Sequence, residues 1–122
     1  MQVSKQTIQP KIERDLHRGL CQLISDITSF EEAEDILHEL LSETERVAIM
    51  KRLGIALFLD KNWSYDKIKK TLKVSSATIA SVQERMGRPG LQTAIEKAKI
   101  NEMADSWSEK LGGVFSIFRK KA

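Results

Sequence analysis

The chain has 122 residues, enough for one domain with a core of its own and short for two. No apolar run approaches the length of a bilayer span and the polar N-terminus lacks the apolar stretch of a signal peptide, so we expect a cytoplasmic protein. The net charge of +3 excludes little, but a lone cysteine, Cys21, excludes an internal disulfide and a zinc site of cysteine pairs.

The first 28 residues predict a short arm followed by a helix. Residues 1–9 are polar and are interpreted as a flexible N-terminal arm. From Pro10 to about Thr28, apolar residues recur at near-helical spacing, which predicts an amphipathic helix. Its apolar stripe consists of Ile12, Leu16, Leu20, Leu23, Ile24 and Ile27. Cys21 belongs to the same pattern, so we expect it to be buried as a small apolar residue.

Two capping boxes open the next two helices. Ser29 followed by Glu32 predicts the start of a second helix, and Ser42 followed by Glu45 predicts the start of a third. In this motif the serine side chain accepts a hydrogen bond from the backbone of the first turn, and the acid returns one. Strand patterns are almost absent, so the expected fold class is all-α.

The third helix, from about Glu43 to Asp60, is apolar on nearly every side in its second half, Leu53 to Leu59. A domain this small cannot easily surround such a helix alone. We therefore expect burial against a second copy, in an obligate homodimer.

Residues 63–86 predict a helix-turn-helix, two short helices joined by a tight turn. Ser64 is placed to cap the first helix, and Ser75 or Ser76 the second. Lys73 occupies the turn, where a left-handed backbone is expected, at a cost of about 1 kcal/mol for a residue other than glycine. The residues expected to face inward are Ile68, Leu72, Val74, Ile79 and Val82.

The exposed side of the second of these helices is small and polar, and the charge around it is basic. Hydroxyls and methyl groups of this size can approach base edges in a major groove. Residues 61–88 carry seven bases against two acids, whereas residues 29–46 carry seven acids against one base. These patterns favour DNA binding. The alternatives are a helical hairpin with only a structural role and a charged face that is merely solvated.

After Met86 the sequence Gly87 to Gly90 ends the second helix of the motif, and a last helix with Leu91, Ala94, Ile95, Ala98 and Met103 inward is expected. We assign residues 10–104 to one domain, with the helix-turn-helix at 64–86, and residues 105–122 to a C-terminal tail. This tail is interpreted as a strap on the body or on a partner subunit, with membrane-surface attachment as the alternative.

No pattern indicates catalysis. His17 and His38 lie 21 residues apart on different predicted helices, without metal-ligand spacing. No glycine-rich loop of the kind that cradles phosphate is present either. We therefore expect a binding protein rather than an enzyme, with no metal site.

Residues 40–86 resemble the Trp repressor family, and more closely its YerC/YecD-like branch. The segments that carry the resemblance are LLSETERVAIMKRLGIALFL from Leu40 to Leu59, then WSYDKI, and SATIASV from Ser76 to Val82. In the family an L-[ST]-x-x-E-R segment starts the helix before the DNA-reading motif, and A-T-I lies on the recognition helix. The resemblance implies an all-α, Trp-repressor-like helical bundle that forms an intertwined homodimer and binds operator DNA.

The resemblance also implies which residues meet DNA. The family's base-facing positions correspond to Ser76, Ala77, Thr78 and Ala80, and its phosphate-facing lysine to Lys69. Together with the basic and capping residues around the motif, the predicted DNA-binding set is Tyr65, Lys69, Lys70, Lys73, Ser75, Ser76, Ala77, Thr78, Ala80 and Ser81.

In the tryptophan repressors a ligand pocket lies between the E-R helix and the recognition helix, where two arginines sandwich the amino acid. Arg52 matches the first arginine. This chain has Ser81 in place of the second arginine, Val82 in place of a small glycine of the family's pocket, and Arg85 in place of a pocket serine. We therefore expect no cofactor and no response to tryptophan. The candidate effector pocket comprises Ser42, Arg52, Ser81 and Arg85. Arg52 is alternatively interpreted as the ion-pair partner of a neighbouring acid.

Taken together, these patterns predict a sequence-specific DNA-binding transcriptional regulator, acting as a homodimer on a two-fold-symmetric operator to repress transcription. Two half-sites one helical turn apart, about 34 to 36 Å, suit such a dimer. The alternative is a helical protein-interaction adaptor that has lost operator binding.

Overall fold

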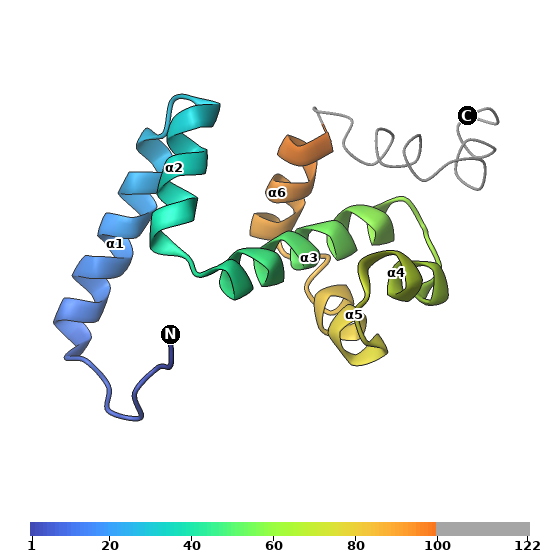
Figure 1. The fold of residues 1–122 in the computed structure, drawn as a ribbon, viewed down its shortest axis with the longest axis horizontal. Helices are drawn as coiled ribbons and strands as arrows, with labels where there is room; N and C mark the ends of the chain where they lie inside the picture. Colours follow the sequence, from blue (N-terminus) through green and yellow to red (C-terminus); the bar gives the residue numbers. More distant parts are fainter. Residues whose placement is uncertain (100–122) are drawn as a thin grey trace. The chain divides into compact units, whose positions relative to one another are not determined.

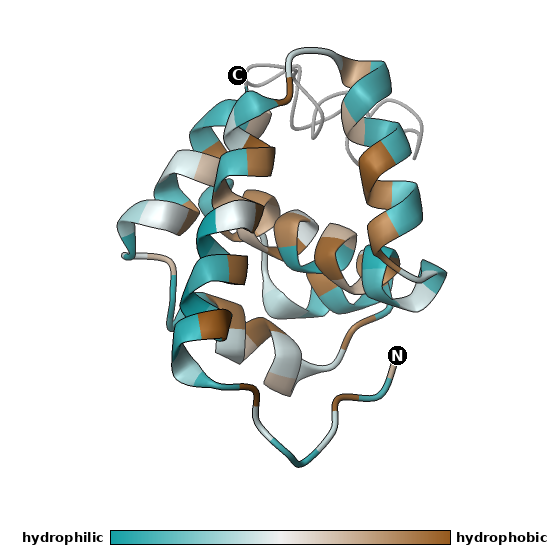
Figure 2. Cartoon of the chain, turned by 90° about the vertical axis from the view of Figure 1, so that its left-hand side faces the viewer, coloured by the Kyte–Doolittle hydropathy of each residue, from teal (hydrophilic) through white to brown (hydrophobic). Residues whose placement is uncertain are grey.

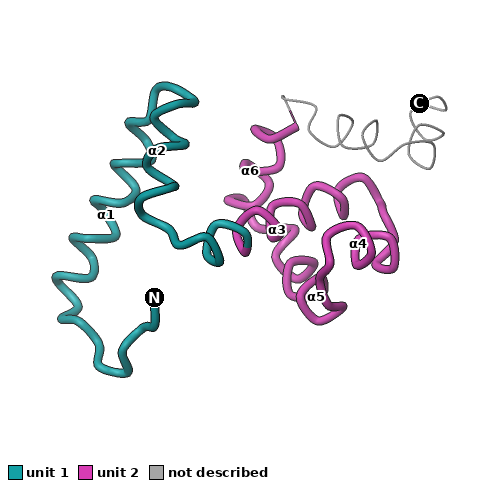
Figure 3. The backbone as a smooth tube through the Cα atoms, viewed as in Figure 1, with its two compact units in different colours: residues 1–47 teal, residues 48–122 magenta. Residues whose placement is uncertain are grey.

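A computed structural model describes residues 1–99, and within them it contains six α-helices and no strand (Figure 1). The all-α fold class is confirmed. These residues belong to two compact units, the first over residues 1–47 and the second from residue 48 onward (Figure 3). Met103 and the predicted tail at 105–122 lie outside the described residues.

Unit 1 contains α1 (Pro10–Asp26) and α2 (Phe30–Leu40), which are joined by residues 27–29 and run in opposite directions (Figure 1). Proline suits the first position of α1 because the backbone donor that it lacks would have no helical partner there. The helix ends at Asp26, two residues before the predicted end. The capping box of α2 forms as predicted: Ser29 Oγ accepts from the Glu32 backbone and Glu32 Oε1 accepts from the Thr28 backbone, both at 3.1 Å.

The apolar stripes of α1 and α2 are uncovered in the single chain. No residue of either helix is fully buried. On α1 the side chains of Ile12, Leu16, Leu20 and Ile24 are between 47% and 63% exposed. Apolar bands recur along both helices in Figure 2. Cys21 is exposed in the described chain, so the expectation that it is buried is wrong for the single subunit.

The start of α3 (Glu43–Asp60) is fixed by the second capping box. Ser42 Oγ accepts from the Glu45 backbone at 3.1 Å, and Glu45 Oε1 accepts from the Ser42 backbone at 2.8 Å. One turn further, Arg46 Nη1 donates to the carbonyl of Leu41 at 3.1 Å, just beyond the C-terminus of α2. The segment Leu41 to Arg46 therefore ends one helix and begins the next.

Unit 2 packs α4 (Tyr65–Leu72), α5 (Ser76–Gln83) and α6 (Pro89–Lys99) with the second half of α3. The eight buried apolar residues form one cluster: Ile55, Ala56, Leu57, Phe58, Ile68, Ile79, Val82 and Ile95. Leu72 and Val74 pack against it from the turn between α4 and α5. All five residues predicted to face inward therefore contribute to this core.

The position of the α3 core corrects one expectation from the sequence. Ile55 and Phe58 have no exposed surface, and Leu57 is 3% exposed, within a single chain. The prediction that this segment needs a second copy to bury it is wrong, because α4, α5 and α6 supply the apolar surface that covers it. The exposed apolar side chains of α1 and α2, and not those of α3, are the ones that a second copy could cover.

The end of α3 is shaped by aromatic stacking. Phe58 and Trp63 lie parallel, with ring centroids 3.8 Å apart. Asn62, with φ of 64°, reverses the chain, and the Trp63 backbone donates to the Phe58 carbonyl at 3.0 Å. This turn delivers the chain to Ser64, where α4 begins.

Candidate nucleic-acid interface

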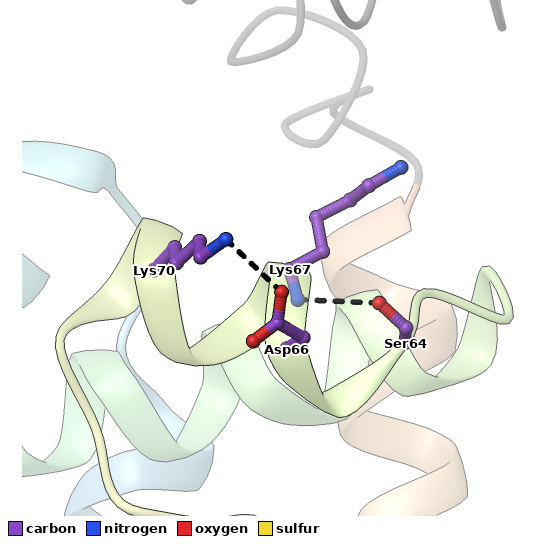
Figure 4. A network of polar contacts seen from close by, with 4 residues as sticks. All are labelled: Ser64, Asp66, Lys67 and Lys70. Carbon is purple, nitrogen blue, oxygen red and sulfur yellow. Dashed lines mark hydrogen bonds and ion pairs between the residues drawn. The ribbon is translucent and has the colours of Figure 1, made fainter.

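The helix-turn-helix begins at Ser64, whose Oγ accepts a hydrogen bond from the Lys67 backbone at 3.2 Å (Figure 4). Asp66 and Lys70 form an ion pair of 3.1 Å along the same helix, with both side chains about three-quarters exposed. A surface pair of this kind stabilises a helix only slightly. It leaves Lys70 oriented along α4, and contact with a phosphate would have to compete with Asp66.

The turn between α4 and α5 is held by backbone geometry and by one contact from α3. Lys73 adopts the left-handed conformation predicted for it, with φ and ψ both 56°, and its N–H donates to the Lys69 carbonyl at 2.9 Å. Lys51 Nζ donates to the Lys73 carbonyl at 3.2 Å. No local sequence pattern predicts this role for Lys51, because the residue that it contacts lies 22 positions further along the chain. This contact ties the turn to the core helix.

The second helix of the motif, α5, is capped by Ser75 and not by Ser76. Ser75 Oγ accepts from the Thr78 backbone at 3.1 Å and lies 2.9 Å from Thr78 Oγ1. The Thr78 hydroxyl thus already has one partner within the protein. Its methyl group and its remaining hydrogen-bonding capacity are available to a ligand.

Burial divides α5 into two sides. Ile79 and Val82 enter the core, with 0% and 4% exposure. Ser76, Ala77, Thr78 and Ser81 are exposed, and Ala80 is half-buried. We call these five residues the reading face. They are the small, polar residues that the sequence predicted for the exposed side of this helix. The helix itself ends at Gln83, three residues before the predicted end.

The lysines predicted to contact phosphates lie on α4 and in the turn that leads to α5. Lys69, Lys70 and Lys73 are all exposed. Within residues 1–99, Lys69 and Lys73 form no ion pair. Tyr65, the first residue of α4, is 37% exposed. Another lysine of α4, Lys67, is not in the predicted set, and its Nζ lies 5.5 Å from the centroid of the Trp63 ring. The predicted DNA-binding residues therefore all belong to α4, the turn and α5.

A pocket of about 610 Å³ lies between α3, α5 and α6. It brings together three of the four residues of the candidate effector pocket: Arg52, Ser81 and Arg85. The fourth, Ser42, belongs to unit 1 and acts as the cap of α3. A further arginine, Arg88, lines the pocket; the sequence counted it only as one of the bases near the motif.

Arg52 forms no ion pair with another residue of 1–99, and its interpretation as the partner of a neighbouring acid stays a prediction. Its side chain is exposed at the pocket. Val82, at the position where the family's tryptophan sensors carry glycine, also lines this pocket and is largely buried.

Residues 1–99 contain neither a metal-ligating cluster nor a membrane-spanning helix. No group of three or more histidine, cysteine, aspartate or glutamate side chains is arranged to hold a metal ion there. None of the described helices is long and apolar enough to cross a membrane.

Comparison with protein-family models matches residues 16–99 to the model described as Trp repressor protein. The chain belongs to the Trp repressor family. The match covers more than half of the chain and includes α2 to α6 whole. No curated protein and no solved structure matches the chain.

Family membership gives the helix-turn-helix a context. The Trp repressor family is one of DNA-binding transcription regulators and not of enzymes. The segment from Leu41 to Arg46, which carries the family's L-[ST]-x-x-E-R pattern, has a structural explanation here: serine and glutamate cap α3 and arginine binds the end of the α2 segment. The branch within the family stays a prediction.

Proposed function

We propose that this protein is a transcriptional repressor that binds a two-fold-symmetric operator as a homodimer in the cytoplasm. The observation that carries the proposal is the reading face of α5, five small residues held outward by two buried ones, next to exposed lysines on α4 and in the turn. Repression follows if the bound dimer occludes a promoter. Neither a cofactor nor tryptophan is required.

The proposed binding mode places α5 in the major groove. Small side chains let the helix backbone approach the base edges, and the hydroxyls of Ser76 and Ser81 and the methyl groups of Ala77 and Thr78 offer hydrogen bonds and thymine contacts. Lys69 and Lys73 would bind phosphates on either side of the groove. The N-terminal end of α5, capped by Ser75, carries the partial positive charge of the helix dipole, which would favour a phosphate placed there.

The proposed dimer is supported by the uncovered stripe of α1, which consists of Ile12, Leu16, Leu20 and Ile24. A buried leucine or isoleucine stabilises an interface by about 1.5 to 3 kcal/mol. An identical stripe on a second copy is a suitable partner, since two-fold interfaces are self-complementary. Leu37 and Leu40 on α2 extend the apolar surface that such a partner could cover.

The decisive experiment is selection of bound sequences from random duplexes, followed by titration of the selected duplex at several salt concentrations. We expect a two-fold-symmetric consensus and a log-log slope of roughly −0.9 for each phosphate contact. A protein-interaction adaptor would show neither a consensus nor a steep slope, and that result would refute the proposal.

Two variants test the assignment of roles. Thr78→Ala should change which sequences are selected and weaken the preferred site by about 1 to 3 kcal/mol, because a base contact is lost. Lys69→Ala should weaken all duplexes alike and flatten the salt slope by about one per subunit. Lys97→Ala, at an exposed lysine of α6 outside the motif, is the matched control and should leave both measurements unchanged. Equal effects of Thr78→Ala and Lys69→Ala on selectivity would contradict the assignment.

A further inference from the structure

We propose that the pocket between α3, α5 and α6 binds a small organic dianion, a dicarboxylate or a phosphate monoester, as the regulatory ligand of this protein. The inference rests on the proposed function, since a regulatory ligand needs an activity to regulate. We call the site the arginine pocket, because Arg52, Arg85 and Arg88 all line it.

The charge of the pocket indicates an anion. Among residues 1–99 no carboxylate lines the site, and none of its three arginines forms an ion pair with another of these residues. Arginine stays protonated in proteins, so these like charges cannot relieve their repulsion by releasing a proton, as lysine or histidine can. An anion with two negative charges is the ligand that relieves it.

The geometry of guanidinium favours oxyanions. Its planar fork of N–H donors matches carboxylate and phosphate groups through paired hydrogen bonds. The three arginines come from different segments, with Arg52 on α3 and the others in the link between α5 and α6. A ligand bound by all three would therefore connect these segments.

The rest of the lining indicates a small organic group. Val82, Leu91 and Ala94 contribute apolar surface, and Ser81 adds one hydroxyl. A volume of about 610 Å³ lies within the range of small-molecule sites. Inorganic phosphate alone would leave this apolar surface wet, so we favour a ligand that carries a compact apolar part.

The same residues disfavour tryptophan. A free amino acid is a zwitterion, and its ammonium group would lie among arginine charges, with no carboxylate from residues 1–99 in the pocket to receive it. Ser81 offers no flat group on which an indole ring could stack. The Val82 side chain also lines the pocket, at the position where the family's tryptophan sensors carry glycine.

The pocket is connected directly to the reading face, because Ser81 belongs to both and Val82 follows it on α5. A ligand that prefers one position of α5 relative to α3 and α6 would change the DNA affinity in proportion to that preference.

The test is calorimetric titration of the full-length protein, without DNA, using phenyl phosphate, succinate and L-tryptophan as separate probes at constant ionic strength. We expect saturable binding of phenyl phosphate or succinate at or below about 1 mM, and none of L-tryptophan up to several times that concentration. The first two probes distinguish a phosphate monoester from a dicarboxylate. Tighter binding of tryptophan, or no saturable binding of either dianion, would overturn the proposal.

Substitutions then locate the site. The double variant Arg85→Gln and Arg88→Gln, and the single variant Arg52→Gln, should each weaken dianion binding at least tenfold. These side chains are exposed, so the variants are expected to fold, which circular dichroism checks. Lys97→Gln removes one positive charge from α6 outside the pocket and should change binding less than twofold. Dianion binding that survives the arginine variants would place the ligand elsewhere and refute the site.

A last arm tests regulation with the selected duplex. Saturating dianion should change the DNA affinity at least threefold in the parent protein and not in the arginine variants. An unchanged affinity would refute the regulatory role. If the arginines instead bind DNA phosphates, the variants will flatten the salt slope and the titration without DNA will show no dianion binding. That failure is distinguishable from failure of the proposed function, which is measured by selection without ligand.

Discussion

The two units of this chain use their apolar residues differently. Unit 2 buries Ile55, Phe58, Ile68 and Ile79 completely within one subunit. Unit 1 has comparable apolar residues at helical spacing, yet none of the residues of α1 and α2 is fully buried. An apolar helix segment therefore does not by itself indicate where a partner is needed: the apolar second half of α3 is covered within unit 2, whereas the apolar stripe of the amphipathic helix α1 is exposed.

The difference also separates two tasks. Unit 2 holds the reading face and the arginine pocket on a core that is complete. Unit 1 carries an apolar surface that is suited to association. We infer that the first unit serves the proposed dimer and that the second serves the proposed recognition of DNA.

The largest effect is expected for Leu16→Asp. If a second copy covers the α1 stripe, the change loses about 2 kcal/mol of leucine burial in each subunit and adds the desolvation of two carboxylates. The dimer should then dissociate at least a thousandfold more readily. Sedimentation at about 10 µM should show a mass near 13.9 kDa instead of twice that value.

Ser25→Asp, on the opposite side of α1, is the control and should remain dimeric. Since Leu16 is 63% exposed in the subunit, its replacement should not disturb the core of unit 2. A parent protein that is already monomeric and folded would contradict the proposed architecture.

The next effect contrasts the cores in the monomeric Leu16→Asp background. Ile79→Ala should lower the free energy of unfolding of unit 2 by about 3 kcal/mol, because it leaves a cavity in a closed core. Leu37→Ala should cost less than about 1 kcal/mol, because this side chain is already half exposed. Urea titration followed by circular dichroism measures both, and equal costs would remove the distinction between the units.

A smaller effect is expected in the turn of the helix-turn-helix. Lys73→Gly should stabilise the fold by roughly 0.5 kcal/mol, because glycine tolerates a φ of 56° without steric cost and part of this gain is offset by its greater freedom in the unfolded chain. Lys73→Ala is the matched control, since it removes the charge and keeps the strain. Both variants should flatten the salt slope of DNA binding by about one per subunit, and a difference in slope between them would count against a phosphate contact.

The smallest effect concerns the cap that joins α2 to α3. Hydrogen bonds from the Ser42 backbone and hydroxyl lower the pKa of Glu45 below its ordinary value of 4.5. The folded state therefore favours the carboxylate, and this contribution to stability is present above about pH 4.5 and is lost as the pH falls through the lowered pKa. The difference in free energy of unfolding between the parent and Glu45→Gln should shrink as the pH falls below about 4.5. Urea titrations at a series of pH values measure this difference. Glu34→Gln on α2 is the control, and a pH-independent difference would contradict the explanation.

The local structure could be predicted from the sequence because its signals are short-range. Ser29, Ser42 and Ser64 begin helices where their caps indicate, and Lys73 takes the left-handed conformation of the turn. Each depends on contacts within about four residues, which the sequence displays directly. The inward residues of the helix-turn-helix followed from helical periodicity for the same reason.

Only the tertiary structure decided which apolar surfaces are covered and which charged residues meet. The burial of Leu57 depends on α4, α5 and α6, which follow α3 in the chain and whose packing no local pattern specifies. Likewise, Lys51 reaches the turn across 22 residues, and Arg52 and Arg88 line one pocket although 35 residues separate them in the sequence. Helical periodicity indicates which side of a helix a side chain occupies, but its contacts depend on packing between segments that are distant in the sequence. The family resemblance had placed Arg52, Ser81 and Arg85 in one pocket, and only the fold added Arg88 to them.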